Sequence, residues 1–152
     1  MNKRRQFISQ LTALIVAGPL AARAADTGPL VQVYKSPTCG CCSKWADHMR
    51  AAGFTVEATN VPDVNQYKRQ FGVPPQLASC HTAVVESYIV EGHVPADDVI
   101  KMLRQKPAIK GIAVPGMPMG SPGMESPNPE RYETIAFTAD GLTSVFAVHE
   151  PA

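Results

Sequence analysis

The pattern of hydrophobic and polar positions changes period several times along the chain. Short β-branched or alternating runs have the period of two that is typical of strands. Other segments repeat apolar residues every three or four positions, which is the spacing of an amphipathic helix. The pattern predicts, in order, strand, helix, strand, helix, strand, strand and helix, at 30–34, 42–52, 54–59, 63–71, 82–85, 88–94 and 95–104.

The remainder of the chain differs in character. Residues 113–129 contain five prolines, three glycines and three methionines without a helical or strand period, so we expect a long loop. After it, two alternating runs at 132–138 and 142–148 flank Asp140-Gly141, a typical signal of a tight hairpin. The expected fold is one α/β domain of order β-α-β-α-β-β-α, followed by this Pro/Gly/Met-rich loop and a C-terminal β-hairpin.

The first residues have the layout of an export signal. A basic head at 3–5 precedes an uncharged apolar run at 11–22, which ends beside small residues suited to cleavage. Gly18-Pro19 interrupts the run, which is shorter than the roughly 20 residues of a membrane span. We therefore expect a signal peptide over 1–24, a mature domain over 25–152 without a membrane span, and a periplasmic location. The general secretory route and the twin-arginine route both stay open.

Loss of the signal peptide changes the charge of the chain. The precursor has 14 basic and 13 acidic residues, a formal net charge of +1. Removing residues 1–24 takes away four basic residues and no acidic ones, so the mature chain carries −3. No basic patch remains that would favour nucleic acid or an anionic membrane as a partner.

Three of the four cysteines crowd into one turn between the first strand and the first helix. Cys39, Cys41 and Cys42 cannot all pair with one another, and a Cys39–Cys42 disulfide would leave Cys41 over. An exported protein meets an oxidising compartment, where a spare exposed thiol is a liability. We therefore interpret the three thiols as soft ligands for a thiophilic metal, above all copper(I). The alternative is a structural disulfide with one spare thiol.

The same turn has the Cys-x-x-Cys spacing of a thiol–disulfide redox pair. Cys39 and Cys42 lie at the start of a predicted helix, whose partial positive charge favours thiolate over thiol. Thiolate attacks disulfides and also binds metals, so position alone leaves both functions open. Cys41 favours the metal, because a third thiol would compete in disulfide exchange but would supply one more bridge between metal ions.

Other sulfur and imidazole groups lie far along the chain. Met117 and Met119 are in the long loop, where methionine has little core to fill, and a thioether is a soft ligand suited to copper(I). Packing on the domain surface is the alternative for both. His93 and His149 fall on predicted strands, and we interpret them as residues of solvated faces rather than ligands.

The order strand, cysteine turn, helix, strand, helix, hairpin, helix resembles the thioredoxin-like fold over residues 30–104. In that fold a cis-proline typically enters the third strand and lies against the redox pair. Here Cys80 falls at about that place, whereas Pro74-Pro75 come several residues too early. The resemblance implies that Cys80 faces the cysteine turn, with four sulfurs around one cavity. His81 beside it either binds metal or points to the opposite face of its strand.

Four motifs tighten the resemblance, and together they are specific: Cys39-Gly40-Cys41-Cys42, Cys80-His81-Thr82, Val90-Glu91-Gly92-His93-Val94-Pro95 and Ala113-Val114-Pro115-Gly116-Met117-Pro118-Met119-Gly120. By them the chain resembles the exported bacterial copper-resistance family called CopG over nearly all of its mature length. The resemblance implies a periplasmic copper-binding protein of copper resistance that holds copper(I), with a thiolate-bridged cluster and a copper redox role as further options. Other periplasmic copper-handling proteins would be its partners. The implied copper ligands are Cys39, Cys41, Cys42, Cys80, His81, Met117 and Met119.

Other function classes stay open beside copper binding. A thiol–disulfide oxidoreductase would use Cys39 as nucleophile and Cys42 as resolving thiol. A four-cysteine iron–sulfur electron carrier would suit twin-arginine export, but it would leave the methionine loop without a role, and a zinc site would do the same. We expect a metal-binding protein rather than an enzyme, and an oxidoreductase if it is an enzyme.

Overall fold

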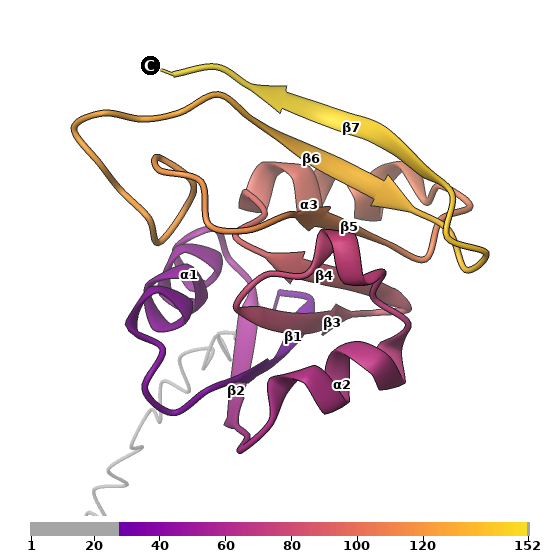
Figure 1. Ribbon diagram of the computed structural model, residues 1–152, viewed down its shortest axis with the longest axis horizontal. Coiled ribbons are helices and arrows are strands. Elements are labelled where there is room, and N and C mark those ends of the chain that lie inside the picture. The colour runs from indigo at the N-terminus through magenta and orange to yellow at the C-terminus, as the bar shows by residue number, and fades with distance from the viewer. Residues whose placement is uncertain (1–27, 152) are drawn as a thin grey trace, which may run out of the picture.

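The computed structural model describes residues 28–151, so the predicted signal peptide lies outside the described residues. Within this range the chain forms one seven-stranded sheet with three α-helices and a short 3-10 helix (Figure 1). The elements are β1 (Leu30–Lys35), α1 (Gly40–Ala51), β2 (Thr55–Asn60), α2 (Val64–Phe71), η1 (Pro75–Leu77), β3 (His81–Val85), β4 (Tyr88–Gly92), α3 (Ala96–Gln105), β5 (Gly111–Val114), β6 (Tyr132–Phe137) and β7 (Thr143–His149).

The sheet has the strand order β2-β1-β3-β4-β5-β6-β7. The pairs β1–β2 and β4–β5 are parallel, and a helix connects the two strands of each pair; the other four pairs are antiparallel. This confirms a mixed α/β fold, the predicted order of the first seven elements and the C-terminal hairpin. No helix within residues 28–151 is long and apolar enough to cross a bilayer.

Strand β5 differs from the prediction, which placed Ala113 and Val114 in the long loop. All four residues of Gly111–Val114 are buried, and they pair with β4 on one side and β6 on the other. A strand of four residues that ends at a proline has too few positions to show a period. Because β5 is central, it joins the hairpin β6–β7 to the main sheet (Figure 1).

Helices cover both faces of the sheet. On one face, α1 and α3 bury Trp45, Met49 and Met102 in the larger hydrophobic core, each without exposed surface. On the other face, Leu77 of η1 and Phe71 at the end of α2 pack in a second apolar cluster. Burying one large apolar side chain contributes about 1.5–3 kcal/mol, so these contacts fix α1 and its N-terminal turn against the sheet.

Two polar contacts also hold α1 in place. The indole Nε1 of Trp45 donates to the Val94 carbonyl at 2.8 Å, and His48 Nε2 accepts from the Ala96 amide at 3.0 Å. Both partners belong to the connection from β4 into α3. The helix that begins at the cysteine turn is therefore tied to the chain that follows β4.

Candidate metal centre

Three cysteines occupy the N-terminal turn of α1. Strand β1 ends at Lys35, the Cys39 amide closes the next turn on the Ser36 carbonyl at 3.2 Å, and the helix begins at Gly40. Cys39 is thus the N-cap residue, and Cys41 and Cys42 lie in the first helical turn. This places the sulfurs at the positive end of the helix dipole, which favours anionic sulfur.

The fourth cysteine reaches this turn through strand pairing. In the antiparallel pair β1–β3, Lys35 lies opposite His81, so the start of β3 is next to the end of β1. Cys80 Sγ lies 3.9 Å from Cys41 Sγ, which in turn is 3.4 Å from Cys39 Sγ. All four cysteine sulfurs lie within 4.8 Å of one another. The structure therefore brings Cys80 to the cysteine turn, as the resemblance implied.

Two of the four sulfurs are covalently joined. Cys39 and Cys42 form a disulfide, the pairing that the ligand interpretation disfavoured, and Cys41 and Cys80 are the free thiols. A set of four thiolates therefore requires this disulfide to be reduced first. Reduction takes two electrons and two protons, and a dithiol can supply both.

Cys80 lies at the junction of two sets of ligand atoms. Its sulfur is 2.9 Å from His93 Nε2 and 3.5 Å from His81 Nδ1, in addition to the neighbouring Cys41 sulfur. Burial raises the pKa of the Cys80 thiol to about 12, and the charge of Cys41 adds to this effect. The thiol therefore keeps its proton at neutral pH, and a metal that binds Cys80 has to displace this proton.

His93 is a candidate ligand that the sequence analysis misassigned. Its side chain is fully buried, and not on a solvated face. Its Nδ1 lies 2.7 Å from the Pro122 carbonyl, which can only accept, so Nδ1 carries the hydrogen and Nε2 directs its lone pair at Cys80. A signal was present in the sequence, because pairing back from the turn at Glu86-Ser87 sets His93 opposite Cys80.

His81 is also fully buried, and its ring lies 4.4 Å from the ring of Trp45. Burial lowers the pKa of His81 well below its usual value, and burial also lowers the pKa of His93. Both rings are therefore neutral at pH 7, which is the form that binds metals. Within residues 28–151, His81 Nε2 has no hydrogen-bond partner despite its burial. Cys80, His81 and His93 form a second ligand set within 4.8 Å.

The segment 115–124, here called the methionine loop, is anchored on both sides of the cluster. At its start, Gly116 bonds to the backbone of Ala78, and at its end Pro122 accepts from His93. Gly123 lies so close to the first turn of α1 that an added Cβ would be 2.6 Å from the Cys41 carbonyl oxygen. Met117 and Met119 between these anchors are 52 % and 43 % exposed. About half of each side chain is therefore open to solvent, so neither methionine fills the hydrophobic core.

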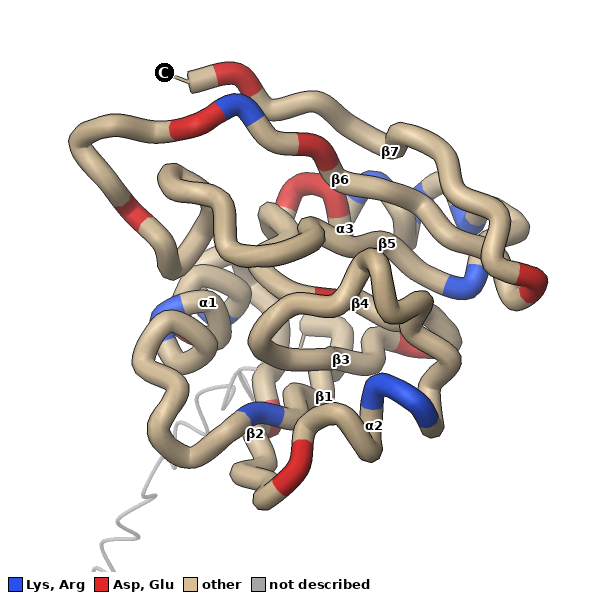
Figure 2. Tube along the Cα trace, viewed as in Figure 1, with Lys and Arg blue, Asp and Glu red and all other residues tan. Residues whose placement is uncertain are grey.

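Three segments of the chain next to the cluster carry no formal charge. The cysteine turn, the segment between η1 and β3, and the methionine loop contain no Lys, Arg, Asp or Glu. Figure 2 therefore shows the methionine loop in tan. An anionic or cationic substrate would find no complementary charge in these segments. Sulfur and imidazole are donors that suit thiophilic metals, so the residues gathered here fit a site for such a metal.

Comparison with known proteins gives two close solved structures. They are named "Copper resistance protein copG- Form 1" and "Copper resistance protein copG- Form 2", and each is 41% identical to the chain. Each match covers 80% of this chain and 98% of the other, with TM-scores of 0.76 and 0.77. A family model described as "Protein of unknown function, DUF411" matches residues 77–124, which include Cys80, His93 and the methionine loop. No curated protein matches the chain significantly.

Proposed function

The chain belongs to the CopG family of copper resistance proteins, and from this premise we propose that it binds copper(I) through its cysteine cluster. The observation that carries the proposal is the convergence of the four cysteine sulfurs, which come from two stretches nearly 40 residues apart in sequence. Reduced thiolates can each bridge two copper ions, so we propose a polynuclear copper(I) cluster. Met117 and Met119 would close the site from the loop, and His81 would bind from the sheet.

The histidines extend this proposal to copper redox chemistry. Sulfur ligands favour copper(I), whereas imidazole also suits copper(II). Cys80 belongs to both ligand sets, so a copper ion at Cys80 has sulfur on one side and nitrogen on the other. We therefore propose that the site tolerates both oxidation states, so that bound copper(I) could give one electron to an external one-electron oxidant and stay bound as copper(II).

A periplasmic location and a thioredoxin-like fold of the domain belong to the same proposal. The location is supported by the signal-like layout of residues 1–24 and by the disulfide at Cys39 and Cys42, which is typical of oxidising compartments. The thioredoxin-like fold is supported by the element order from β1 to α3 and by a Cys-x-x-Cys pair at the start of α1. Other periplasmic copper-handling proteins would exchange copper with this site.

Copper(I) titration tests the proposed function. Protein reduced under anaerobic conditions competes with a chromophoric copper(I) chelator, and we expect the wild type to withdraw more than one copper per chain. Cys80→Ser removes a proposed direct ligand, so it should lower the affinity by more than the roughly 10- to 100-fold that loss of an outer-shell partner costs. Ser87→Ala is the matched control, since Ser87 lies exposed at the opposite end of β3 from Cys80. A reduced wild type that leaves all copper on the chelator would refute copper binding.

Thiol–disulfide exchange is the second candidate, because the structure contains the Cys39–Cys42 disulfide at a helix N-terminus. An oxidoreductase should reduce or isomerise a disulfide substrate with turnover. That turnover should disappear in Cys39→Ser and survive in Cys41→Ser, since Cys41 has no role in the exchange. Loss of copper binding in Cys41→Ser, with no turnover by the wild type, would favour the copper site.

A further inference from the structure

A buried ion pair lies next to the segment that carries Cys80. Lys68 Nζ on α2 is 2.5 Å from Glu91 Oε1 on β4, and the two side chains are only 8% and 0% exposed. Thr82 on β3 donates its hydroxyl to Glu91 Oε2 at 2.6 Å and accepts from Lys68 at 3.1 Å. The pair thus connects α2, β3 and β4 at the end of the sheet where the cluster lies.

Stability alone does not explain such a pair. Removing two charges from water costs several kcal/mol per ion, and apolar replacements of buried pairs are often neutral or stabilising. The remaining bond of Glu91 gives a different reason. Glu91 Oε1 accepts the backbone N–H of Ser79 at 2.6 Å. Ser79 lies between the end of η1 and the start of β3, so this N–H, one residue before Cys80, has no partner from the sheet.

Ser79 is fixed from two further sides. Its hydroxyl donates to the Gly116 carbonyl at the root of the methionine loop, and the adjacent Ala78 carbonyl accepts the Gly116 amide at 3.3 Å. Behind it lies Gly92, where an added Cβ would be 2.5 Å from both Cβ and Oγ of Ser79. The position of the Ser79 backbone therefore fixes the position of the neighbouring Cys80 and of the first residues of the methionine loop.

We propose that the Lys68–Glu91 pair positions the copper site through Ser79. The carboxylate holds the Ser79 amide, and Ser79 then sets the distance of Cys80 and of the methionine loop from the cysteine turn. Lys68 keeps the buried carboxylate compensated and directed at Ser79. Both are positioning residues, because they act through Ser79 and not on the metal. The inference rests on the proposed copper binding.

Two uncharged double variants test this role. In Lys68→Met/Glu91→Gln the amide oxygen of glutamine can still accept from Ser79, whereas in Lys68→Met/Glu91→Leu nothing can. Both remove the ion pair and both stay neutral, so they differ in the acceptor for the Ser79 amide. We expect the leucine variant to bind copper(I) about 10- to 100-fold more weakly than wild type. The glutamine variant should recover most of that affinity.

The readouts separate positioning from general damage. Urea unfolding reports whether each variant is folded, while chelator competition and copper stoichiometry report on the site. Equal copper(I) affinities of the two folded variants would overturn the positioning role. A wild type that binds no copper would instead refute the proposed function, before any variant is compared.

A third variant tests the positioning role of Ser79 if the leucine variant does not fold. Ser79→Ala keeps the amide on Glu91 and removes the hydroxyl bond to Gly116 together with the 4.0 Å contact of the hydroxyl with Cys80 Sγ. We expect weaker copper(I) binding with an unchanged unfolding midpoint, because the methionine loop loses its tie to Cys80. In wild-type protein the Ser79 amide should also exchange slowly with deuterium. An unprotected Ser79 amide, or wild-type affinity in Ser79→Ala, would overturn the proposal.

Discussion

Gly92 occupies a position where the backbone and its neighbours leave no space for a side chain. Its φ is +72°, and a Cβ would lie 2.5 Å from the side chain of Ser79 and 2.6 Å from the Val114 carbonyl oxygen. The left-handed conformation costs an L-residue roughly 1–2 kcal/mol, and overpacking adds about 1–3 kcal/mol. We predict that Gly92→Ala lowers the free energy of unfolding by roughly the sum of these two costs. It should also displace Cys80 and weaken copper(I) binding.

Gly72 supplies a matched control for this prediction. Its φ is +71°, but an added Cβ would have no neighbour within 4 Å, so Gly72→Ala has the backbone cost without the clash. The difference in unfolding free energy between the two variants isolates the part that comes from close contact with Ser79 and Val114. Equal losses in Gly92→Ala and Gly72→Ala, with unchanged copper binding in both, would contradict the assignment of Gly92 as a close-packing site.

His93 and His149 make a second matched comparison. His93 Nε2 directs its lone pair at Cys80, whereas His149 Nε2 lies 2.8 Å from Asp98 and 3.2 Å from the Thr134 hydroxyl. We predict that His93→Gln weakens copper binding by at least the roughly 10- to 100-fold that loss of an outer-shell partner costs, and that His149→Gln leaves it unchanged. Chelator competition on both variants measures this. Wild-type affinity in His93→Gln would exclude His93 as a ligand, and an equal loss in both variants would show that the loss is not specific to the site.

The sequence revealed sulfur ligands more readily than nitrogen ligands. Crowding of Cys39, Cys41 and Cys42 is visible in one short segment, and thiolates are soft donors that bind copper(I). The hairpin register sets His93 opposite Cys80, but the burial of His93 also depends on the loop at Pro122, 29 residues later in the chain. A histidine on a predicted strand has no local feature that separates a solvated face from a buried one.

At the scale of elements, the N-terminal turn of α1 is where the oxidation state changes the ligand set. With the Cys39–Cys42 disulfide intact, the site has two free thiols and two neutral imidazoles. After reduction it has four thiols. We predict that the oxidised protein binds fewer copper(I) ions than the reduced protein, because each bridging thiolate is an added ligand. Stoichiometries measured anaerobically with and without prior reduction check this.

A double variant controls for side effects of the reductant. In Cys39→Ser/Cys42→Ser no disulfide can form in this turn, so copper stoichiometry should be low and independent of reduction. A wild type that binds the same number of copper ions before and after reduction would show that Cys39 and Cys42 are not ligands. The structure would then favour Cys80, His81 and His93 as the binding set.

Elements with a clear period were predicted well, and short ones were not. Strands β1, β2, β3, β4, β6 and β7 and helices α1, α2 and α3 lie close to their predicted ranges. Strand β5 was missed, since its assignment depends on pairing with β4 and β6 rather than on its own four residues. The role of the methionine loop in closing over the turn likewise depends on contacts of Gly116 and Gly123, which no local pattern indicates.

At the scale of the whole molecule, buried histidines make stability depend on pH. Burial lowers the pKa values of His48, His81 and His93 in the folded protein. Above about pH 6.5 these groups are neutral in both states and contribute no difference. Below that value the unfolded chain binds protons first, so the free energy of unfolding falls toward the lower, folded pKa values. We predict that metal-free protein is less stable at pH 5 than at pH 7.5, and urea unfolding at both values checks this.

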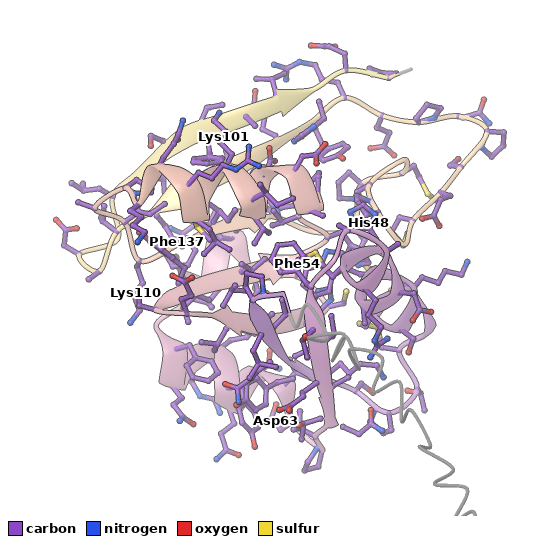
Figure 3. All side chains as sticks on the ribbon, turned by 180° about the vertical axis from the view of Figure 1, so that it is seen from behind. His48, Phe54, Asp63, Lys101, Lys110 and Phe137 are labelled. Carbon is purple, nitrogen blue, oxygen red and sulfur yellow. A yellow bond between two sulfur atoms is a disulfide. The ribbon has the colours of Figure 1, made fainter. Side chains whose placement is uncertain are left out.

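His48 allows one part of this dependence to be removed by itself. It lies on α1 (labelled in Figure 3), its Nε2 accepts from the Ala96 amide, and the charges of Asp97 and Glu125 oppose only part of the burial effect on its pKa. We predict that His48→Gln keeps the acceptor, has near wild-type stability at pH 7.5, and loses less stability than wild type on going to pH 5.

His48→Leu should lose about 1–3 kcal/mol at pH 7.5, because the Ala96 amide is then left without its partner. A glutamine variant with the wild-type loss between pH 7.5 and pH 5 would assign the acid sensitivity to His81 and His93, beside the cysteine cluster, and copper loading should then suppress it.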